Sequence, residues 1–295
     1  MNRRNFLSML ISLVSVTSSL KSSRAYTQTK PFVIGIFPRR NIKITHKTFT
    51  PLAEYLSDVL GREVKIETTK SFSEFWKNIQ SNKYDLVHYN QYHYIVSHLL
   101  FGYEVILKNK EQGKSTIAGS IIVRKDSKIN KVVDLKGKVI LFGGSRRAMQ
   151  SYISATWLLR QSGLNEGDYI EKFAINPPNT IISTFFKRAD ASGSGDVVMY
   201  LDNVAKRIDI SQLKFLAKTR PMSHLPWAVN SNMDDETKVL IQKKLLGLSE
   251  TKYGKMVLHS AKVDAFVLAK DSDYDQHRKI IEDVYGKDYG VSKLR

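Results

Sequence analysis

The sequence predicts an α/β fold of two lobes, each built on a mainly parallel sheet that is flanked by helices. Short apolar runs alternate with amphipathic helical segments, which is the pattern of strand–helix units. The runs are continuously apolar, as in FVIGIF at residues 32–37, because a strand covered on both faces has no solvent side. A second alternating series begins near residue 118, and the chain later leads back to the first, so we expect one lobe to be inserted into the other.

The first series is expected to contain four strands and three helices. Leu52, Leu56 and Leu60 recur at helical spacing, and Gly61 ends that helix. The next helix follows Ser71, a suitable N-cap, and its aromatic stripe is interpreted as core. In chain order the strands are expected at 32–37, 64–68, 84–89 and 104–107, and the helices at 52–60, 72–79 and 91–100.

The second series begins with IAGSIIVRKDS, read as a long strand that leads out of the first lobe, and continues with DLKGKVILFGG. Helices are expected at 148–162 and 178–186 and a strand at 214–218; LPWAVNS then leads back towards helices at 234–246 and 251–258. The expected division is a signal peptide at 1–25, the first lobe at 31–117, the inserted lobe at 118–222 and a return to the first lobe at 223–295. Two hinge crossings fall near residues 118 and 222.

The chain is strongly basic, with a formal net charge of +18 over 295 residues, of which +14 lies beyond the first 25. Such a field attracts nucleic acid, acidic membranes or small anions, although a solvated basic surface is the simpler interpretation. A polyanion or membrane-surface binder would show binding that weakens steeply with salt. The absence of cysteine excludes disulfides, thiolate catalysis and Cys-ligated metals.

The N-terminus has the pattern of a secretory signal. Basic residues precede an apolar run from Phe6 to about Val16, and Ser23-Arg24-Ala25 offers a cleavage site after Ala25. The alternative is a permanent anchor helix, but the apolar run is short for a bilayer. RRNFL resembles the twin-arginine motif, and the export route stays open. Export argues against a nucleic-acid partner and favours small anions.

Four segments together resemble one family: GIFPRR, TFTPLAEYLSDVLGREV, SNKYDLVHYNQYHYIVSH and SIIVRKDSKINKVVDLKGKVILFGG. The chain is similar, from about Phe32 to Gly286, to the periplasmic phosphate/phosphite/phosphonate-binding proteins of ABC transporters, which have the type 2 periplasmic binding-protein fold. The resemblance implies a monomer in the periplasm that captures a small anionic solute between its lobes and delivers it to an ABC permease. It implies no cofactor. A sensor that presents the solute to a membrane receptor or sensor kinase would use the same pocket.

The resemblance also implies site residues. Phe49 stands where phosphonate binders carry a ligand-contacting tyrosine, and Tyr94 matches a second tyrosine. Ser145 falls in a loop that usually reads Asp-Pro-x-Ser-x-Ser-Gly, Asn179 lies near a contact of the second lobe, and Asp196 lies near an aspartate contact. This sequence departs from the pattern in the phenylalanine and in the loop, which puts phosphonate itself in doubt.

The loop FGGSRRAM at residues 142–149 carries its own chemistry. It joins a strand to a helix at the carboxyl end of the sheet, where α/β clefts bind ligands. Gly143 and Gly144 permit close backbone approach, and free N–H groups at the helix start attract an oxyanion. Ser145 could cap the helix or donate to the ligand, and Arg146 or Arg147 could bind an oxyanion through two donors. The alternative is a tight turn with two solvated arginines.

YNQYHY at residues 89–94 is the second candidate, because Tyr89, Asn90 and Tyr94 offer polar groups and flat apolar walls at a strand end. The alternative is that these aromatics are core. His88 and His93 lack the acidic or cysteine neighbours of a metal site, so no metal is expected. Arg39-Arg40 adds positive potential at the same edge. ASGSGD at 191–196 is interpreted as a flexible turn. No catalytic motif is present, so no enzyme activity is expected.

Overall fold

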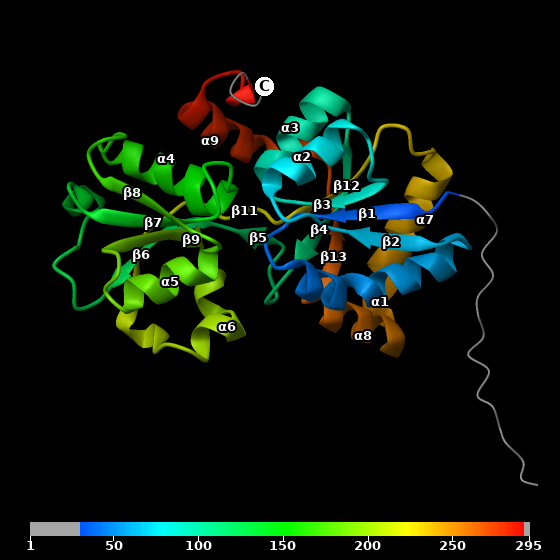
Figure 1. Ribbon diagram of the computed structural model, residues 1–295, viewed down its shortest axis with the longest axis horizontal. Coiled ribbons are helices and arrows are strands. Elements are labelled where there is room, and N and C mark those ends of the chain that lie inside the picture. The colour runs from blue at the N-terminus through cyan, green and yellow to red at the C-terminus, as the bar shows by residue number, and fades with distance from the viewer. Residues whose placement is uncertain (1–29, 292–295) are drawn as a thin grey trace, which may run out of the picture.

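The structure is a computed structural model in which residues 30–291 are described, so the signal peptide expected at 1–25 lies outside the described residues. Two lobes lie side by side, and the last helix, α9 (Asp275–Tyr285), lies along the top of both (Figure 1). Within the described range, no helix combines the length and the apolar character that crossing a bilayer requires.

The first lobe is built on a six-stranded sheet of order β13-β4-β12-β3-β1-β2. Its strands are β1 (Phe32–Ile36), β2 (Val64–Glu67), β3 (Leu86–His88), β4 (Glu104–Lys110), β12 (Pro226–Val229) and β13 (Ala265–Leu268). β1 pairs in parallel with β2 and β3, whereas β12 pairs antiparallel with both β3 and β4. β13 pairs antiparallel with β4 at the edge.

The second lobe has a five-stranded sheet of order β10-β6-β9-β7-β8. Its strands are β6 (Gly119–Arg124), β7 (Val139–Gly143), β8 (Ile170–Ala174), β9 (Ala191–Gly195) and β10 (Leu213–Lys218). β7 pairs in parallel with β8 and β9, and β6 pairs antiparallel with β9 and β10. The predicted two-lobed α/β class is confirmed, but both sheets are mixed. In each, most strands run one way, and a crossing strand, β12 or β6, is inserted between them in the opposite direction.

Helices cover both faces of each sheet (Figure 1). The first lobe has α1 (Ile42–Leu60), α7 (Asp235–Leu246) and α8 (Lys252–Ala261) on one face, with α2 (Phe72–Gln80) and α3 (Gln91–Phe101) on the other. The second lobe has α4 (Ser154–Gln161) on one face and α5 (Pro177–Phe185) with α6 (Asp202–Ala205) on the other. A π turn, η2 (Met149–Ile153), precedes α4; short 3₁₀ turns are η1 (Val132–Leu135), η3 (Val198–Tyr200), η4 (Ile210–Gln212), η5 (Gly247–Glu250) and η6 (Asp271–Tyr274).

Two structures join the lobes. β5 (Thr116–Ile117) and β11 (Met222–Ser223) form an antiparallel ribbon where the chain passes between the two sheets. α9 bridges to α4 through Trp157, whose Nε1 donates to Asp283 Oδ2 at 2.8 Å, and through Arg160, which donates to the carbonyl oxygens of Asp283 and Val284. One buried apolar cluster therefore contains residues of both lobes and of α9.

The segment ASGSGD is not a flexible turn, contrary to the sequence interpretation. Ala191–Gly195 is β9, fully buried in the middle of the second sheet. A Cβ added at Gly193 would come within 2.2 Å of the Ser151 carbonyl oxygen. Small residues are therefore required here because the π turn packs directly on the strand.

Candidate anion-binding site

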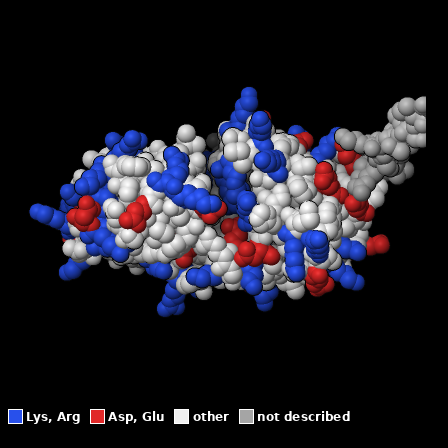
Figure 2. Space-filling model, turned by 90° about the horizontal axis from the view of Figure 1, so that it is seen from below, with Lys and Arg blue, Asp and Glu red and all other residues white. Residues whose placement is uncertain are grey.

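The carboxyl ends of strands from both sheets face each other at the junction of the lobes. β1 and β3 end there in the first lobe, and β7 and β9 end there in the second. Figure 2 shows blue Lys and Arg side chains gathered beside this junction on the lower face, with red side chains close to them. In open α/β sheets, ligands bind at this end of the strands.

Two adjacent arginines follow β1. The guanidinium of Arg39 lies 5.4 Å from the centre of the Phe37 ring and its Nη2 is 3.9 Å from Glu111 Oε1. Arg40 has no ion pair with any described residue. The neighbouring charge of Arg39, and then burial, lower the pKa of Arg40 to about 9, with Glu111 opposing the shift. Arg40 stays charged at neutral pH, so an anion bound here would relieve this repulsion.

Two fully buried histidines lie next to the arginines. His88, at the end of β3, packs on Phe37 with ring centres 5.3 Å apart and stacks on Trp227 at 4.4 Å. Its Nδ1 is 3.1 Å from the carbonyl oxygen of Pro226. His224 lies two residues before Pro226, on the return segment. The Nε2 atom of each histidine has no hydrogen-bond partner in the described part of the chain.

The loop after β7 has a defined shape. Gly144 adopts φ +92°, a conformation that favours glycine, and its N–H donates to the Ala174 carbonyl at 2.8 Å. Ser145 does not cap the following helix, because its Oγ accepts from the Arg147 N–H at 3.2 Å. Ala148 occupies the N-cap position and makes no side-chain bond there. The loop is joined to the first lobe by Asn90, whose Nδ2 donates to the Arg147 carbonyl at 3.2 Å.

The two loop arginines have different surroundings. Arg146 Nη2 lies 2.8 Å from Glu166 Oε1 and 2.7 Å from Glu171 Oε2, and its carbonyl accepts from the Tyr285 hydroxyl. Its guanidinium is therefore already neutralised within the second lobe. Arg147 has a half-buried side chain with no ion pair among the described residues. Of the two arginines, only Arg147 therefore has a charge that is free to pair with an anion.

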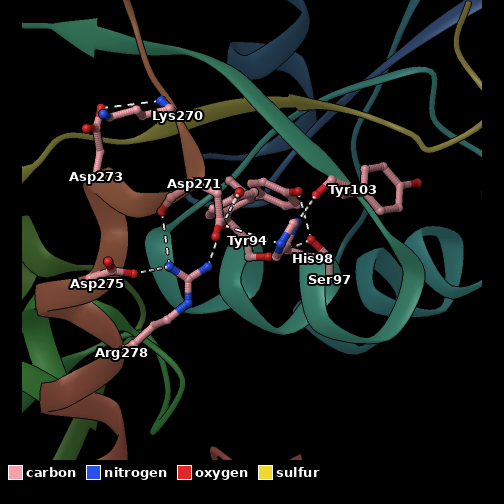
Figure 3. A network of polar contacts seen from close by, with 10 residues as sticks. Tyr94, Ser97, His98, Tyr103, Lys270, Asp271, Asp273, Asp275 and Arg278 are labelled. Carbon is pink, nitrogen blue, oxygen red and sulfur yellow. Dashed lines mark hydrogen bonds and ion pairs between the residues drawn. The ribbon is translucent and has the colours of Figure 1, made fainter.

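The aromatic candidates are all buried. Tyr89 bonds to Ser97 Oγ at 2.8 Å, and the Tyr94 hydroxyl donates to Asp271 Oδ1 at 2.6 Å. In Figure 3 Tyr94 points to Asp271, which Arg278 of α9 holds from the other side. Phe49 packs against His88 and Trp227 with ring centres about 6 Å apart. These three side chains are therefore part of the core in this conformation, and the tyrosine hydroxyls already have partners.

The remaining candidates lie on the second lobe. The N–H of Asn179 is bonded to the cap residue Asn176 of α5 at 3.1 Å. Asp196 follows β9, and its Oδ1 accepts from the Ala118 N–H at 3.0 Å where the chain crosses between the sheets. The structure thus brings Asn90, Arg147 and Asp196 to the junction. No group of acidic or histidine side chains suited to a metal ion is found within residues 30–291.

Sequence reasoning missed His224 and Glu111 and gave His88 no role beyond a rejected metal site. His88 and His224 are 136 positions apart in the sequence and meet only because β12 returns between β3 and β4. The sequence feature that could have identified both histidines is their position next to the end of a strand.

The fold and the site define a class: a two-lobed binding protein with a cationic junction and no catalytic constellation among its described residues. The chain belongs to the family described as "ABC transporter, phosphonate, periplasmic substrate-binding protein", which it matches over residues 34–274. It is therefore a periplasmic solute-binding protein of that family, whose members bind substrates for transport and are not enzymes. A small anionic solute and a membrane permease are its partners.

Solved structures support the fold. A binding protein component of an ABC phosphonate transporter from Pseudomonas aeruginosa is 15% identical, with a TM-score of 0.74 over 89% of this chain and 88% of that one. PhnD1 from Prochlorococcus marinus, in complex with methylphosphonate, is 19% identical, with a TM-score of 0.74 over 87% and 99%. The aliphatic sulphonate binding protein SsuA from Escherichia coli is 12% identical, with a TM-score of 0.61 over 87% of each chain. The same fold thus serves both phosphonate and sulphonate binders.

Proposed function

We propose that this protein captures a small phosphorus oxyanion, such as a phosphonate, phosphite or phosphate, at the junction of its lobes. Arg39 and Arg40 hold the anion from the first lobe, and Arg147 approaches it from the second. Asn90, Gly144 and Ser145 position the second-lobe loop. This assignment moves the main cationic contact from the loop after β7 to the loop after β1.

Binding is coupled to closure of the lobes. In this proposal the lobes are residues 31–117 with 223–295 and residues 118–222, and the β5–β11 ribbon contains the hinges. A ligand that contacts both lobes favours the closed state, because only that state offers all of its contacts. Phe49, Tyr89 and Tyr94 form the apolar wall, and Asn179 and Asp196 line the second-lobe side.

The proposal includes the export of a monomer. The first 25 residues act as a signal peptide, with the Arg3-Arg4 pair directing the twin-arginine route or the general secretory route. In the periplasm the loaded protein docks on its ABC permease. The alternative is presentation of the same solute to a membrane sensor kinase, which would use the same junction.

The observation that carries the proposal is the Arg39–Arg40 pair, in which only Arg39 has an acidic neighbour within 4.0 Å among the described residues. Isothermal titration calorimetry of the purified protein with methylphosphonate, phosphite and phosphate at fixed ionic strength tests it. We expect saturable binding of at least one of them in the micromolar range, since a few charge-assisted hydrogen bonds supply that affinity.

A matched pair of variants locates the site. Arg40→Gln should weaken binding at least 10-fold, because it removes a charged donor worth about 1.5–3 kcal/mol. Arg62→Gln is the control, since Arg62 lies over Phe32 at the amino end of the same strand, with its guanidinium 5.1 Å from the ring centre. Equal affinities in the two variants would place the anion elsewhere, and the absence of binding by all three anions would refute the proposed ligand class.

A further inference from the structure

Three buried polar atoms without partners gather around one short segment, residues 223–226. They are His88 Nε2, Gln91 Oε1 and His224 Nε2, none of which has a hydrogen-bond partner in residues 30–291. The other end of each side chain is fixed to this segment: His88 Nδ1 to Pro226 O, Gln91 Nε2 to Ser223 O at 3.1 Å, and His224 Nδ1 to the Leu225 N–H at 2.8 Å. A buried polar group without a partner is destabilising, so three in one place point to a missing ligand.

The backbone contacts determine which nitrogen of His88 carries its proton. A carbonyl oxygen can only accept, so Nδ1 donates its hydrogen to Pro226 O. The neutral ring therefore presents Nε2 as a bare lone pair. Burial, and then the charge of Arg39, hold the pKa of His88 well below its usual range, so the ring remains neutral.

His224 has the opposite tautomer. A backbone N–H can only donate, so Nδ1 of His224 is the acceptor and the neutral ring carries its hydrogen on Nε2. Gln91 donates through its amide nitrogen to Ser223 O, which leaves its amide oxygen as a second unpaired acceptor. The cluster therefore offers two acceptors, His88 Nε2 and Gln91 Oε1, and one neutral donor, His224 Nε2–H.

A fully ionised oxyanion cannot satisfy this set. Arg39 and Arg40 are donors and suit any anionic oxygen, but the lone pair of His88 would face negative oxygen and repel it. An oxyanion that keeps one acidic hydrogen can present it to one of the two acceptors, His88 Nε2, and its charged oxygens to the donors; Gln91 Oε1 is then the acceptor that this hydrogen leaves over. Phosphonate and phosphate keep such a hydrogen near neutral pH, whereas sulfonate and sulfate do not.

We infer that His88 is the specificity-determining residue of the anion site: its Nε2 accepts the remaining acidic hydrogen of a phosphonate or phosphate, while His224 Nε2–H and the arginines donate to the charged oxygens. This inference rests on the proposed function. It makes the protein selective for oxyanions that keep a proton. Sulfonates, which other proteins with this fold bind, would be excluded.

Calorimetry with two ligands of the same shape tests the inference. Methylphosphonate and methanesulfonate differ chiefly in the acidic hydrogen, as do phosphate and sulfate. At fixed pH near neutrality and fixed ionic strength, we expect methylphosphonate to bind the unaltered protein about 10- to 100-fold more tightly than methanesulfonate, which is the range that an unpaired buried acceptor implies.

His88→Phe keeps a flat ring on Trp227 and removes both nitrogens. We expect the affinity ratio of the two ligands to fall to within about threefold, mainly because methylphosphonate binds less tightly. His277→Gln is the matched control: His277 is also fully buried and also has an unpaired nitrogen, but it lies on α9 against Gln150. This control should keep the full ratio.

The outcomes separate the two proposals. Equal binding of methylphosphonate and methanesulfonate by the unaltered protein overturns the role of His88 and leaves oxyanion capture intact. Failure of every oxyanion to bind overturns oxyanion capture itself. If His88→Phe does not fold, equal binding by the unaltered protein still overturns the role of His88. A preserved ratio in a folded His88→Phe protein assigns selectivity to another residue and also overturns it.

Discussion

The side-chain amide of Asn90 donates to the backbone carbonyl of Arg147 at 3.2 Å and so joins the end of β3 in one lobe to the loop after β7 in the other. The same side chain caps α3, because its Oδ1 accepts from the His93 N–H at 3.0 Å. One residue therefore caps a helix and makes a direct hydrogen bond between the lobes. These two roles use different atoms and can be separated by substitution.

Asn90→Asp should weaken ligand binding without unfolding the protein. The carboxylate keeps the capping oxygen but faces the Arg147 carbonyl with a second acceptor, which disfavours the closed arrangement. We expect about a 5- to 20-fold loss of affinity, as one hydrogen bond implies, and an increased radius of gyration by small-angle X-ray scattering. Asn176→Asp, in the cap of α5, is the control and should leave both quantities unchanged.

Arg146→Gln should affect stability more than binding. Arg146 pairs with Glu166 and with Glu171, which in turn accepts from the Tyr152 hydroxyl at 2.7 Å. Because the arginine is half exposed, we expect a loss of only about 0.5–1 kcal/mol in the free energy of unfolding, measured with urea. A loss of affinity for the oxyanion greater than 10-fold would instead make Arg146 a ligand contact.

Tyr94→Phe distinguishes a wall residue from a ligand contact. The substitution removes the hydroxyl that donates to Asp271, while Arg278 still holds that carboxylate (Figure 3). We expect the unfolding free energy to fall by about 1–3 kcal/mol, since the bond joins a buried hydroxyl to a charged group. Ligand affinity should stay within about twofold, and a larger decrease would place the hydroxyl in the binding site.

The protein should lose stability as the pH falls below about 6.5. Burial lowers the pKa of both His93 and His277 to about 3, so between pH 6.5 and 3 the unfolded chain binds protons that the folded chain does not. Each such histidine contributes a slope of about 1.4 kcal/mol per pH unit in this range. Replacing His277 with Gln should reduce the slope of unfolding free energy against pH by that amount, and an unchanged slope would contradict the assignment.

The sequence predicted the elements whose signal is local and missed those set by distant contacts. The helices at Gln91–Phe101 and Asp235–Leu246 were expected almost to the residue, because Asn90 and Asp234 are N-caps and a glycine follows each helix. α1 begins at Ile42 rather than 52, since its first turns bury threonines that carry no apolar pattern. β13 and α9 were not anticipated.

The candidate site shows the same division. The loop at residues 142–149 was placed correctly at a strand end. Its sequence does not reveal that Arg146 forms ion pairs with Glu166 and Glu171. β9 was read as a turn because glycine and serine usually mark turns, whereas here they admit a closely packed backbone. Contacts across more than 100 residues, such as His88 with Pro226, are fixed by topology and leave no local pattern.

The position of β12 between β3 and β4 determines the order in which the two lobes can fold during synthesis. All strands of the second sheet are present once Lys218 has been synthesised. At that point the first sheet still lacks β12, which pairs with β3 on one side and with β4 on the other. Until Pro226–Val229 is added, β3 and β4 expose unpaired edges, the condition in which chains aggregate or attract chaperones. The inserted lobe can therefore fold during synthesis. The first lobe can fold only when nearly the whole chain has been made, so the protein becomes able to bind its ligand only at the end of synthesis.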